Sequence, residues 1–188
     1  MELMQAIRGR RSIRVFDGRP IDRPVLEEIV GAASYAPSRM NVQPWHFHVA
    51  TGEARQRVAA VMAMTTAYLQ EYVDVLGPEH VEHAARFYAD LGGAPVIIGI
   101  SSPRDDDVFE ARDFAISVGA AIQNLLLAVE DNGLGACSLS VPVWIRDQLA
   151  EVFEVDAEWE IMSLIVMGHA DESPHPRDRH TDVVTFLT

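Results

Sequence analysis

Residues 36–45 read APSRMNVQPW and join a predicted helix to a predicted strand. Pro37 ends the helix, and the second proline biases the residue before it toward an extended conformation. Ser38, Asn41 and Gln43 offer small hydroxyl and amide groups from this rigid connection. Such groups suit a sugar-like chain or the edge of a heterocycle rather than a metal, but serine and asparagine also satisfy the local backbone of turns. A binding interpretation and a turn interpretation both stay open at this point.

Hydrophobic periodicity predicts the elements on both sides of this connection. The predicted helices cover residues 2–9, 24–35, 54–75, 79–91, 105–132 and 142–153, and the predicted strands cover residues 46–50, 94–101, 136–141 and 159–167. The second strand reads APVIIGIS, a nearly continuous apolar run that is typical of burial on both faces of a sheet. Together these elements predict one α+β domain over residues 1–188, in which helices enclose a small mixed sheet.

The amino-acid composition of the chain limits the classes of molecule that it is expected to bind. The chain has 15 basic and 28 acidic side chains, for a net charge of −13, and 48% of its residues are hydrophobic. A field of that sign repels phosphate backbones and acidic membrane surfaces, which argues against nucleic acid or a membrane as partner. The one cysteine, Cys137, has no internal disulfide partner, and the N-terminus is charged from Glu2 onward, unlike a signal peptide. We therefore expect a cytoplasmic protein.

The longest apolar stretch runs from Phe114 to Val129 and is interrupted by Ser117, Gln123 and Asn124. It is shorter than the roughly 20 residues that a membrane span needs. A helix that is apolar nearly all round needs burial on every side. A second subunit would supply part of that burial, but a central core helix of a single chain explains the same pattern.

A cationic cluster stands out in this acidic chain, because residues 10–14 read RRSIR. Guanidinium groups match phosphate oxygens in pairs and stay charged at any relevant pH, so the cluster suggests a bound anion. A solvated loop with local salt bridges is the alternative. Near the other end of the chain, Arg177 and Arg179 would reach the same anion if the two ends meet.

A glycine-containing stretch over residues 133–140 reads GLGACSLS. Its glycines allow the backbone to approach a flat ligand, and the amides after them would donate to a ring nitrogen. A helix C-cap explains Gly133 and Gly135 equally well. Cys137 lies between small apolar neighbours, which favours a buried filler over a nucleophile.

The histidines have no spacing that predicts a metal site. His46 and His48 alternate in a strand and share a face, but no carboxylate or third ligand is spaced with them. We therefore expect no metal.

These segments, in this order and at these separations, resemble the nitroreductase-like family of flavoproteins. The family pattern opens with RRSxR, continues with APSxxNxQPW and a DxxxAxQNLLLAA-like helix that runs into GLG, and ends with a PR-containing tail before a VV pair. Here the matching pieces begin at residue 10, cover 36–45 and 113–135, and end at Pro176-Arg177 and Val183-Val184. The resemblance covers the chain from about residue 4 to residue 186.

The resemblance implies a cofactor and a set of residues that hold it. It implies FMN, a homodimer with both flavin sites at the subunit interface, and the layered fold of the family. The residues that match the family's FMN-binding positions are Arg10, Arg11, Ser12 and Arg14 for the phosphate and ribityl chain, Arg177 for the phosphate, Pro37, Ser38 and Asn41 approaching from the partner subunit, and Ser138, Leu139 and Ser140 beside the isoalloxazine ring.

The function that the resemblance implies is two-electron reduction of nitroaromatic, quinone or similar small acceptors, driven by NADH or NADPH in a ping-pong cycle. The flavin carries the redox chemistry and the protein supplies binding, orientation and electrostatics, so no protein acid or base is obligatory and no catalytic residue is expected. An oxygen-linked dehydrogenase, a flavin-consuming enzyme or a non-catalytic flavin-binding protein on the same fold are the alternatives.

Residues 65–91 are expected to set substrate choice. Family members that dehalogenate tyrosines grip the amino acid with a lid of Glu, Tyr and Lys. This chain has Glu71, Tyr72 and Tyr88 in the corresponding region but no lysine anywhere, so that lid is incomplete.

Overall fold

The computed structural model describes residues 1–69, 71 and 73–187, with the backbone alone at position 76. Its helices are α1 (Leu3–Gly9), α2 (Arg23–Ser34), α3 (Gly52–Ala63), α4 (Thr66–Leu69), α5 (Val73–Leu76), α6 (Pro78–Asp90), α7 (Val108–Asp131) and α8 (Arg146–Val152), with short 3₁₀ turns η1 (Arg39–Asn41), η3 (Leu91–Gly93) and η4 (Val143–Ile145). Its strands are β1 (His46–Ala50), β2 (Val96–Pro103), β3 (Gly135–Ser140) and β4 (Trp159–Gly168).

The four described strands form one sheet in the order β1-β2-β4-β3, and every neighbouring pair is antiparallel. The prediction of a mixed sheet is therefore correct only for one parallel bridge, between Ser12 and Ala136. This bridge adds the N-terminal segment to the β3 edge of the sheet. Periodicity indicates which faces of a strand are buried but carries no information on strand direction, and for this reason the pairing was not predicted.

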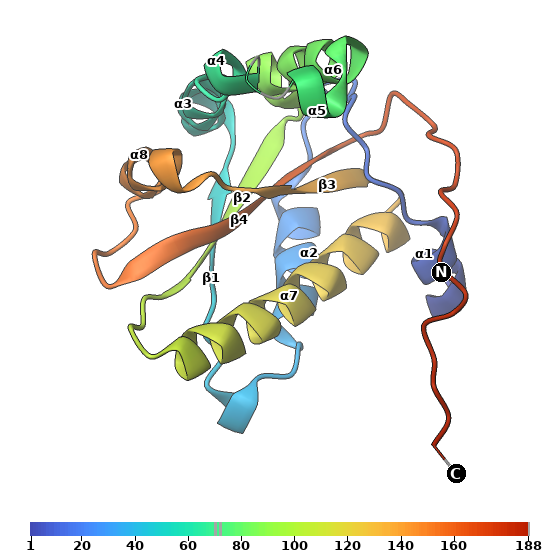
Figure 1. The fold of residues 1–188 in the computed structure, drawn as a ribbon, viewed down its shortest axis with the longest axis vertical. Coiled ribbons are helices and arrows are strands. Elements are labelled where there is room, and N and C mark those ends of the chain that lie inside the picture. The colour runs from blue at the N-terminus through green and yellow to red at the C-terminus, as the bar shows by residue number, and fades with distance from the viewer. Residues whose placement is uncertain (70, 72, 188) are drawn as a thin grey trace.

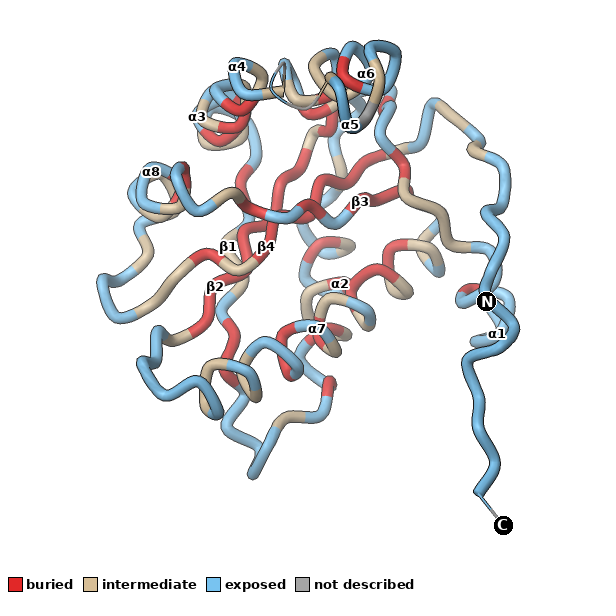
Figure 2. The backbone as a smooth tube through the Cα atoms, in the orientation of Figure 1, coloured by how far each residue is buried: buried red, intermediate tan, exposed pale blue. Residues whose placement is uncertain are grey.

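Helices cover both faces of the sheet, which confirms the layered α+β fold (Figure 1). The core on one face packs against α3, α6 and α8, and the core on the other face packs against α2 and α7. Successive residues of β4 alternate between these cores: Leu164 and Val166 belong to the first, and Ile165 and Met167 to the second. Figure 2 shows this buried layer running through the middle of the molecule.

The predicted helix over 54–75 is wrong in its length. Helix α3 ends at Ala63, and a turn at residues 64–65 separates it from α4. The hydroxyls of Thr65 and Thr66 donate to the carbonyl oxygens of Met62 and Ala63, both at 2.7 Å. Threonine side chains that bond the backbone of the preceding turn compete with helix continuation, which explains the break.

Helix α7 has one buried and one exposed apolar face. It is long and apolar enough to cross a membrane by length and composition alone, a property that core helices of soluble proteins share, and 33% of its apolar stretch is buried in this chain. Leu125 and Val129 are buried against the sheet, whereas the side chain of Ile116 is 64% exposed. The single chain therefore accounts for only part of the burial that the apolar pattern predicts.

The N-terminal and C-terminal segments of the chain meet beside η3, where the N–H of Phe16 donates to the Gly92 carbonyl oxygen. Residues 15–17 pair with residues 169–171 through a bridge between Phe16 and Ala170 and through hydrogen bonds of 2.9–3.1 Å. Beyond this point the tail, residues 173–187, has no regular secondary structure and runs along α1 and away from the sheet (Figure 1).

Candidate active site

The arginine-rich segment lies against strand β3. The backbone N–H of Ile13 donates to the carbonyl oxygen of Ala136 at 2.9 Å, within the bridge that joins Ser12 to Ala136. Gly135 makes this contact possible, because a Cβ there would come within 2.7 Å of the Ile13 side chain. The space left by Gly135 is thus filled by the protein itself, and the segment 10–14 is held next to Ser138.

A second glycine sets the path of the chain after Ser12. Gly92 has a φ of 65°, and a Cβ there would overlap the carbonyl oxygen of Arg14. The N–H of Phe16 donates to the Gly92 carbonyl oxygen at 3.0 Å. The turn between α6 and β2 therefore supports the backbone from which the Arg14 side chain projects. By contrast, Gly133 has open space around it and ends α7, so it is a helix C-cap.

Arg11 is largely engaged by its own helix. Its Nη1 donates to the carbonyl oxygens of Arg8, Gly9 and Arg10 at 2.7–2.9 Å, which caps the C-terminus of α1. Its Nε is buried and has no hydrogen-bond partner within the described chain. Arg11 is thus first a capping residue, with one buried donor left over.

Arg10 and Arg14 belong to the arginines that are left without an ion pair among the described residues. Among the described residues no carboxylate forms an ion pair with either guanidinium, although seven other arginines are so paired. The nearby Glu172 instead accepts hydrogen bonds from the backbone N–H groups of Arg14 and Val15. Eight of the 15 arginines therefore form no ion pair among the described residues, and Arg10 and Arg14 are two of these eight.

Cys137 marks the place where these groups meet. Burial raises the pKa of its thiol, and Arg14, Ser12 and Arg10 oppose that effect. The arginine-rich segment therefore lies near the cysteine on β3, and Glu172 nearby raises the pKa of the thiol. A buried thiol with a raised pKa is a poor nucleophile, which confirms Cys137 as a packing residue.

A pocket of about 340 Å³ opens beside the same strand. Its lining is Arg14, Ser138, Leu139 and Ser140 on one side and His80, His83, Ala84, Phe87 and Tyr88 on the other. Ser138 and Ser140 are exposed, whereas Leu139 is buried in the core, as strand alternation requires. The Ser138 hydroxyl lies 3.1 Å from the Ser163 hydroxyl, which orients it. The volume lies at the low end of the range for small-molecule sites.

The α6 wall of this small pocket lies within residues 65–91, which were expected to set substrate choice, but of its residues only Tyr88 was named in advance. His80, His83, Ala84 and Phe87 occupy positions i, i+3, i+4 and i+7 of one helix and so share a face. That spacing was visible in the sequence, but nothing there indicated what the face would meet. Burial raises the pKa of Tyr88, which keeps its phenol neutral. Of the other lid positions, Glu71 is exposed and Tyr72 lies outside the described residues.

The segment that carries Pro37, Ser38 and Asn41 lies away from the small pocket. It follows α2 at the end of the molecule opposite α6, at the first turn of α7 (Figure 1). Arg39 holds it there through ion pairs to Glu110 and to Asp113, the latter at 2.9 Å. Within one chain these residues do not line the small pocket.

This segment is also locally strained and exposed. The Ser38 hydroxyl accepts from the Gln43 N–H at 3.0 Å, so the turn interpretation of Ser38 is correct. Met40, Asn41 and Gln43 nevertheless have φ of 49°, 59° and 49°, a left-handed conformation that costs energy for residues other than glycine. Met40 is 86% exposed. Arg177, on the tail, is also exposed and forms none of the ion pairs seen among the described residues.

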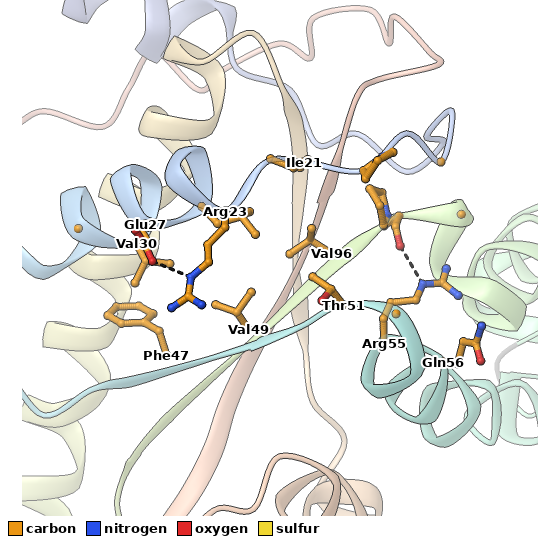
Figure 3. Close-up of a pocket in the computed structure, with 18 of the residues that line it drawn as sticks. Ile21, Arg23, Glu27, Val30, Phe47, Val49, Thr51, Arg55, Gln56 and Val96 are labelled. Carbon is orange, nitrogen blue, oxygen red and sulfur yellow. Dashed lines mark hydrogen bonds and ion pairs between the residues drawn. The ribbon is translucent and has the colours of Figure 1, made fainter.

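A larger groove of about 1210 Å³ lies at the other edge of the sheet, between α2, β1 and the start of α3 (Figure 3). Its apolar lining includes Ile21, Val30, Phe47, Val49 and Val96. Its charged groups are already paired: Arg23 with Glu27 at 2.8 Å, and Arg55 with Asp90 at 2.6 Å. None of the sequence-predicted site residues lines it.

His46 and His48 project from β1, and their ring centroids lie 4.6 Å apart, which confirms the shared face. His48 also contacts the hydroxyl of Ser101 at 2.9 Å. No group of three or more potential metal ligands was found in the described part of the chain.

Several known proteins resemble this chain in sequence or in fold. A nitrobenzene nitroreductase of Ectopseudomonas oleovorans is 33% identical over 162 residues, which cover 70% of each protein. A nitroreductase with bound FMN from Desulfitobacterium hafniense has the same fold, with a TM-score of 0.80 and 21% identity over 100% of this chain and 99% of its own. NfnB from Mycobacterium smegmatis, solved with NADPH, gives a TM-score of 0.77 at 23% identity over 98% and 97% of the two chains. The model of the nitroreductase family matches residues 7–169, and the chain therefore belongs to that family.

Proposed function

We propose that this protein is an FMN-dependent oxidoreductase that uses NADH or NADPH to reduce nitroaromatic, quinone or similar small acceptors. One observation carries the proposal. The bridge between Ser12 and Ala136 holds the segment with Arg10 and Arg14 against β3, and Arg14, which has no ion pair among the described residues, lines the small pocket together with the exposed residues Ser138 and Ser140. A phosphate at one end and a polar flat ring at the other would satisfy both sets of groups.

The residues present fit FMN. Arg10 and Arg14 supply charge for a terminal phosphate, and the buried Nε of Arg11 is a donor that still lacks an acceptor within the described chain. Ser138, Leu139 and Ser140 present a strand edge to the isoalloxazine ring. The relatives named for FMN and NADPH support the same cofactors here.

FMN, when bound, supplies the two-electron chemistry, and the protein positions it and the two substrates in turn. For a nitroaromatic acceptor the net change is R–NO₂ + NAD(P)H + H⁺ → R–NO + NAD(P)⁺ + H₂O. Donor and acceptor would occupy the small pocket alternately, as a ping-pong cycle requires. The serine hydroxyls and backbone of β3 orient the ring, and α6 covers the pocket and limits water.

The phosphate anchor is tested by titrating FMN and riboflavin into apoprotein. Arg10→Ala should weaken FMN about ten-fold or more, because a charge-assisted hydrogen bond is worth about 1.5–3 kcal/mol. Riboflavin lacks the phosphate and should change much less. Arg10 is a cleaner target than Arg11, whose loss would also remove the α1 cap. Arg57→Ala, at an exposed site on α3, is the matched control. Equal losses of affinity for FMN and for riboflavin would show that Arg10 does not bind the phosphate.

Reduction of the bound flavin by NADH and by NADPH, followed by stopped flow, tests the reaction itself. Rapid bleaching of the flavin by either nicotinamide, and its return on adding a nitroaromatic, is the expected result. An oxygen-linked enzyme or a flavin-sequestering protein would not be reduced by nicotinamide at a useful rate, and that outcome would refute the proposed reaction.

We also propose a homodimer that completes each site. The outer face of α7 carries Ala115, Ile116, Gly119 and Gln123 at helical spacing, and Gly119 has no atom within 4 Å of an added Cβ. An exposed apolar helix face with small residues suits close packing against a copy of itself. The strained segment 37–41 lies at the start of the same helix, where a second chain would bring it to its partner's pocket.

The tail of the second copy suits the larger groove. Strand β1 is a sheet edge, with no further strand paired to it among the described residues. The tail carries Val183, Val184, Phe186 and Leu187, which are 64–94% exposed in one chain. Adding this segment along β1 would bury these side chains in the apolar groove and satisfy the strand edge. The tail leaves its own chain beside α1, so the donor would be the partner.

Sedimentation at low micromolar concentration tests the dimer. The full chain should sediment as a dimer, and a chain ending at His180 should dissociate at least a hundred-fold more readily, because it loses apolar contacts of about 1.5–3 kcal/mol per fully buried side chain. Gly119→Leu should also give a monomer, although leucine is the better helix former by up to about 1 kcal/mol. Ala89→Leu, on the exposed side of α6, is the control and should remain dimeric. A wild-type monomer with FMN bound would contradict the dimer and leave the cofactor proposal standing.

A further inference from the structure

The histidines and the acidic residues of helix α6 lie on different faces of the helix. The face that lines the small pocket carries His80, His83, Ala84 and Phe87. The acidic residues Glu79 and Glu82 are exposed and do not line the pocket. Glu82 instead faces Arg86 one turn later, at 4.0 Å. The helix therefore presents imidazoles to the pocket and keeps its carboxylates away from it.

The wall of the small pocket opposite α6 also lacks acidic residues. It consists of Arg14 and the 138–140 stretch of β3, so no aspartate or glutamate lines the pocket within the described chain. Such a lining is unusual for a protein with 28 acidic and 15 basic residues. Phe87 and Tyr88, whose ring centroids lie 5.2 Å apart, supply an aromatic surface next to the two histidines.

We propose that His80 and His83 select acceptors that are aromatic anions, and that they bind a carboxylate on the acceptor's ring. This inference rests on the proposed FMN-dependent function, because the acceptor must reach a flavin beside Ser138 and Ser140. Both histidines are exposed at the pocket rim, so their N–H groups can donate without being buried. An imidazole has at least one N–H donor in either protonation state, and a carboxylate offers two acceptor oxygens. The apolar ring of the ligand would lie against Phe87 and Tyr88.

Among the described residues no aspartate or glutamate lines this pocket, so no carboxylate in its lining repels such a ligand. The neutral amide of the same shape would keep the ring contacts and one acceptor oxygen, but it would lose the negative charge and the second acceptor oxygen for the two histidines. The ratio of the binding affinities for a carboxylate and for its amide therefore measures the contribution of His80 and His83.

The test uses the FMN-loaded protein and two ligands that are not reduced, benzoate and benzamide, with binding measured by calorimetry. Wild type should bind benzoate at least ten-fold more tightly than benzamide. The double variant His80→Gln/His83→Gln keeps polar side chains of similar length and should lose that preference while its benzamide affinity stays within two-fold. His175→Gln, at an exposed site on the tail, is the control and should behave as wild type. Arg14 is left unchanged because it belongs to the proposed FMN site.

Each outcome decides the inference. Equal binding of both ligands by wild type, or an unchanged preference in the double variant, would overturn it. So would a loss of NADPH affinity without a loss of benzoate affinity, because the histidines would then hold the donor's phosphates. FMN affinity is measured separately on the same samples. Failure of wild type to bind FMN would refute the proposed function, whereas normal FMN binding without carboxylate preference would refute only this inference.

Discussion

The small pocket and the larger groove, at opposite edges of the sheet, differ in whether their charged side chains are paired as well as in volume. The groove at β1 has a volume of about 1210 Å³ and the pocket at β3 only about 340 Å³. In the large groove the arginines are already paired with carboxylates, as Figure 3 shows for Arg23 and Glu27. In the small pocket Arg14 has no ion-pair partner within the described chain, and the exposed residues Ser138 and Ser140 complete that wall.

Under the proposed function, unsatisfied charge and not volume distinguishes the proposed cofactor site from the proposed docking surface. An apolar groove beside a free strand edge favours another polypeptide, because a strand satisfies both the backbone and the side chains there. A small pocket with uncompensated cations favours an anionic small molecule. Three substitutions test this contrast.

The largest effect is expected at Gly92, which supports the backbone of Arg14. Gly92→Ala should lower the free energy of unfolding by about 3 kcal/mol, because its Cβ would overlap the Arg14 carbonyl in addition to the strain of a φ of 65°. Gly133→Ala has a similar φ of 68° but open space, so it should cost only about 1–2 kcal/mol. Urea unfolding measures both. Equal losses would mean that the close contact with Arg14 does not support the small pocket.

A middle-sized effect is expected inside the large groove. The Nε of Arg55 donates to the Ala94 carbonyl at 2.8 Å, and its Nη groups donate to Asp90 at 2.6 Å, from a side chain that is only 14% exposed. Arg55→Ala should cost about 2 kcal/mol of stability because it leaves these acceptors unpaired. Arg23→Ala removes an exposed pair in the same groove and should cost less than about 0.5 kcal/mol. If either substitution weakened FMN binding directly, the assignment of the groove to a polypeptide would be wrong.

The smallest effect concerns His48, on the edge strand. Burial, with a smaller contribution from His46, lowers the pKa of His48 below its usual 6.5. The folded protein thus binds this proton less tightly than the unfolded chain does. The stability linked to His48 is complete above pH 6.5 and decreases as the pH falls from there toward the lowered folded value.

His48→Gln keeps a partner for Ser101 and should flatten that part of the pH dependence. Unfolding in urea at pH 7.5, 6.5 and 5.5 measures the slope. His175→Gln, on the exposed tail, is the control and should leave the slope unchanged. A variant slope identical to that of wild type would show that protonation of His48 is not coupled to folding at this edge.

Local patterns predicted the elements well where one physical signal dominated. The strand at His46–Ala50 was predicted with the observed bounds, because alternation and the preceding proline both favour an extended chain there. The helix over 54–75 was predicted too long, because apolar spacing persists past Ala63 while the Thr65 and Thr66 hydroxyls end the helix. Propensity alone does not weigh a side-chain hydrogen bond against a backbone one.

The candidate site was predictable in its parts and not in its arrangement. The sequence by itself determined a cationic segment, a rigid polar connection and a β3 stretch with small residues, because these depend on residue chemistry and local spacing. Only the tertiary structure decided that Arg14 lies beside Ser138, whereas Pro37 and Asn41 lie at the opposite end of the molecule.

The histidines of α6 show the same division. Their shared helix face follows from the spacing in the sequence, since a helix repeats every 3.6 residues. What that face meets depends on how α6 packs over β3, a contact between residues far apart in the chain. Charge compensation was decided in the same way: Arg39 is paired with Glu110 across the fold, whereas Arg14 has no such pair among the described residues. Local sequence determines which groups are available, and only packing between distant segments determines which of them are left to bind a ligand.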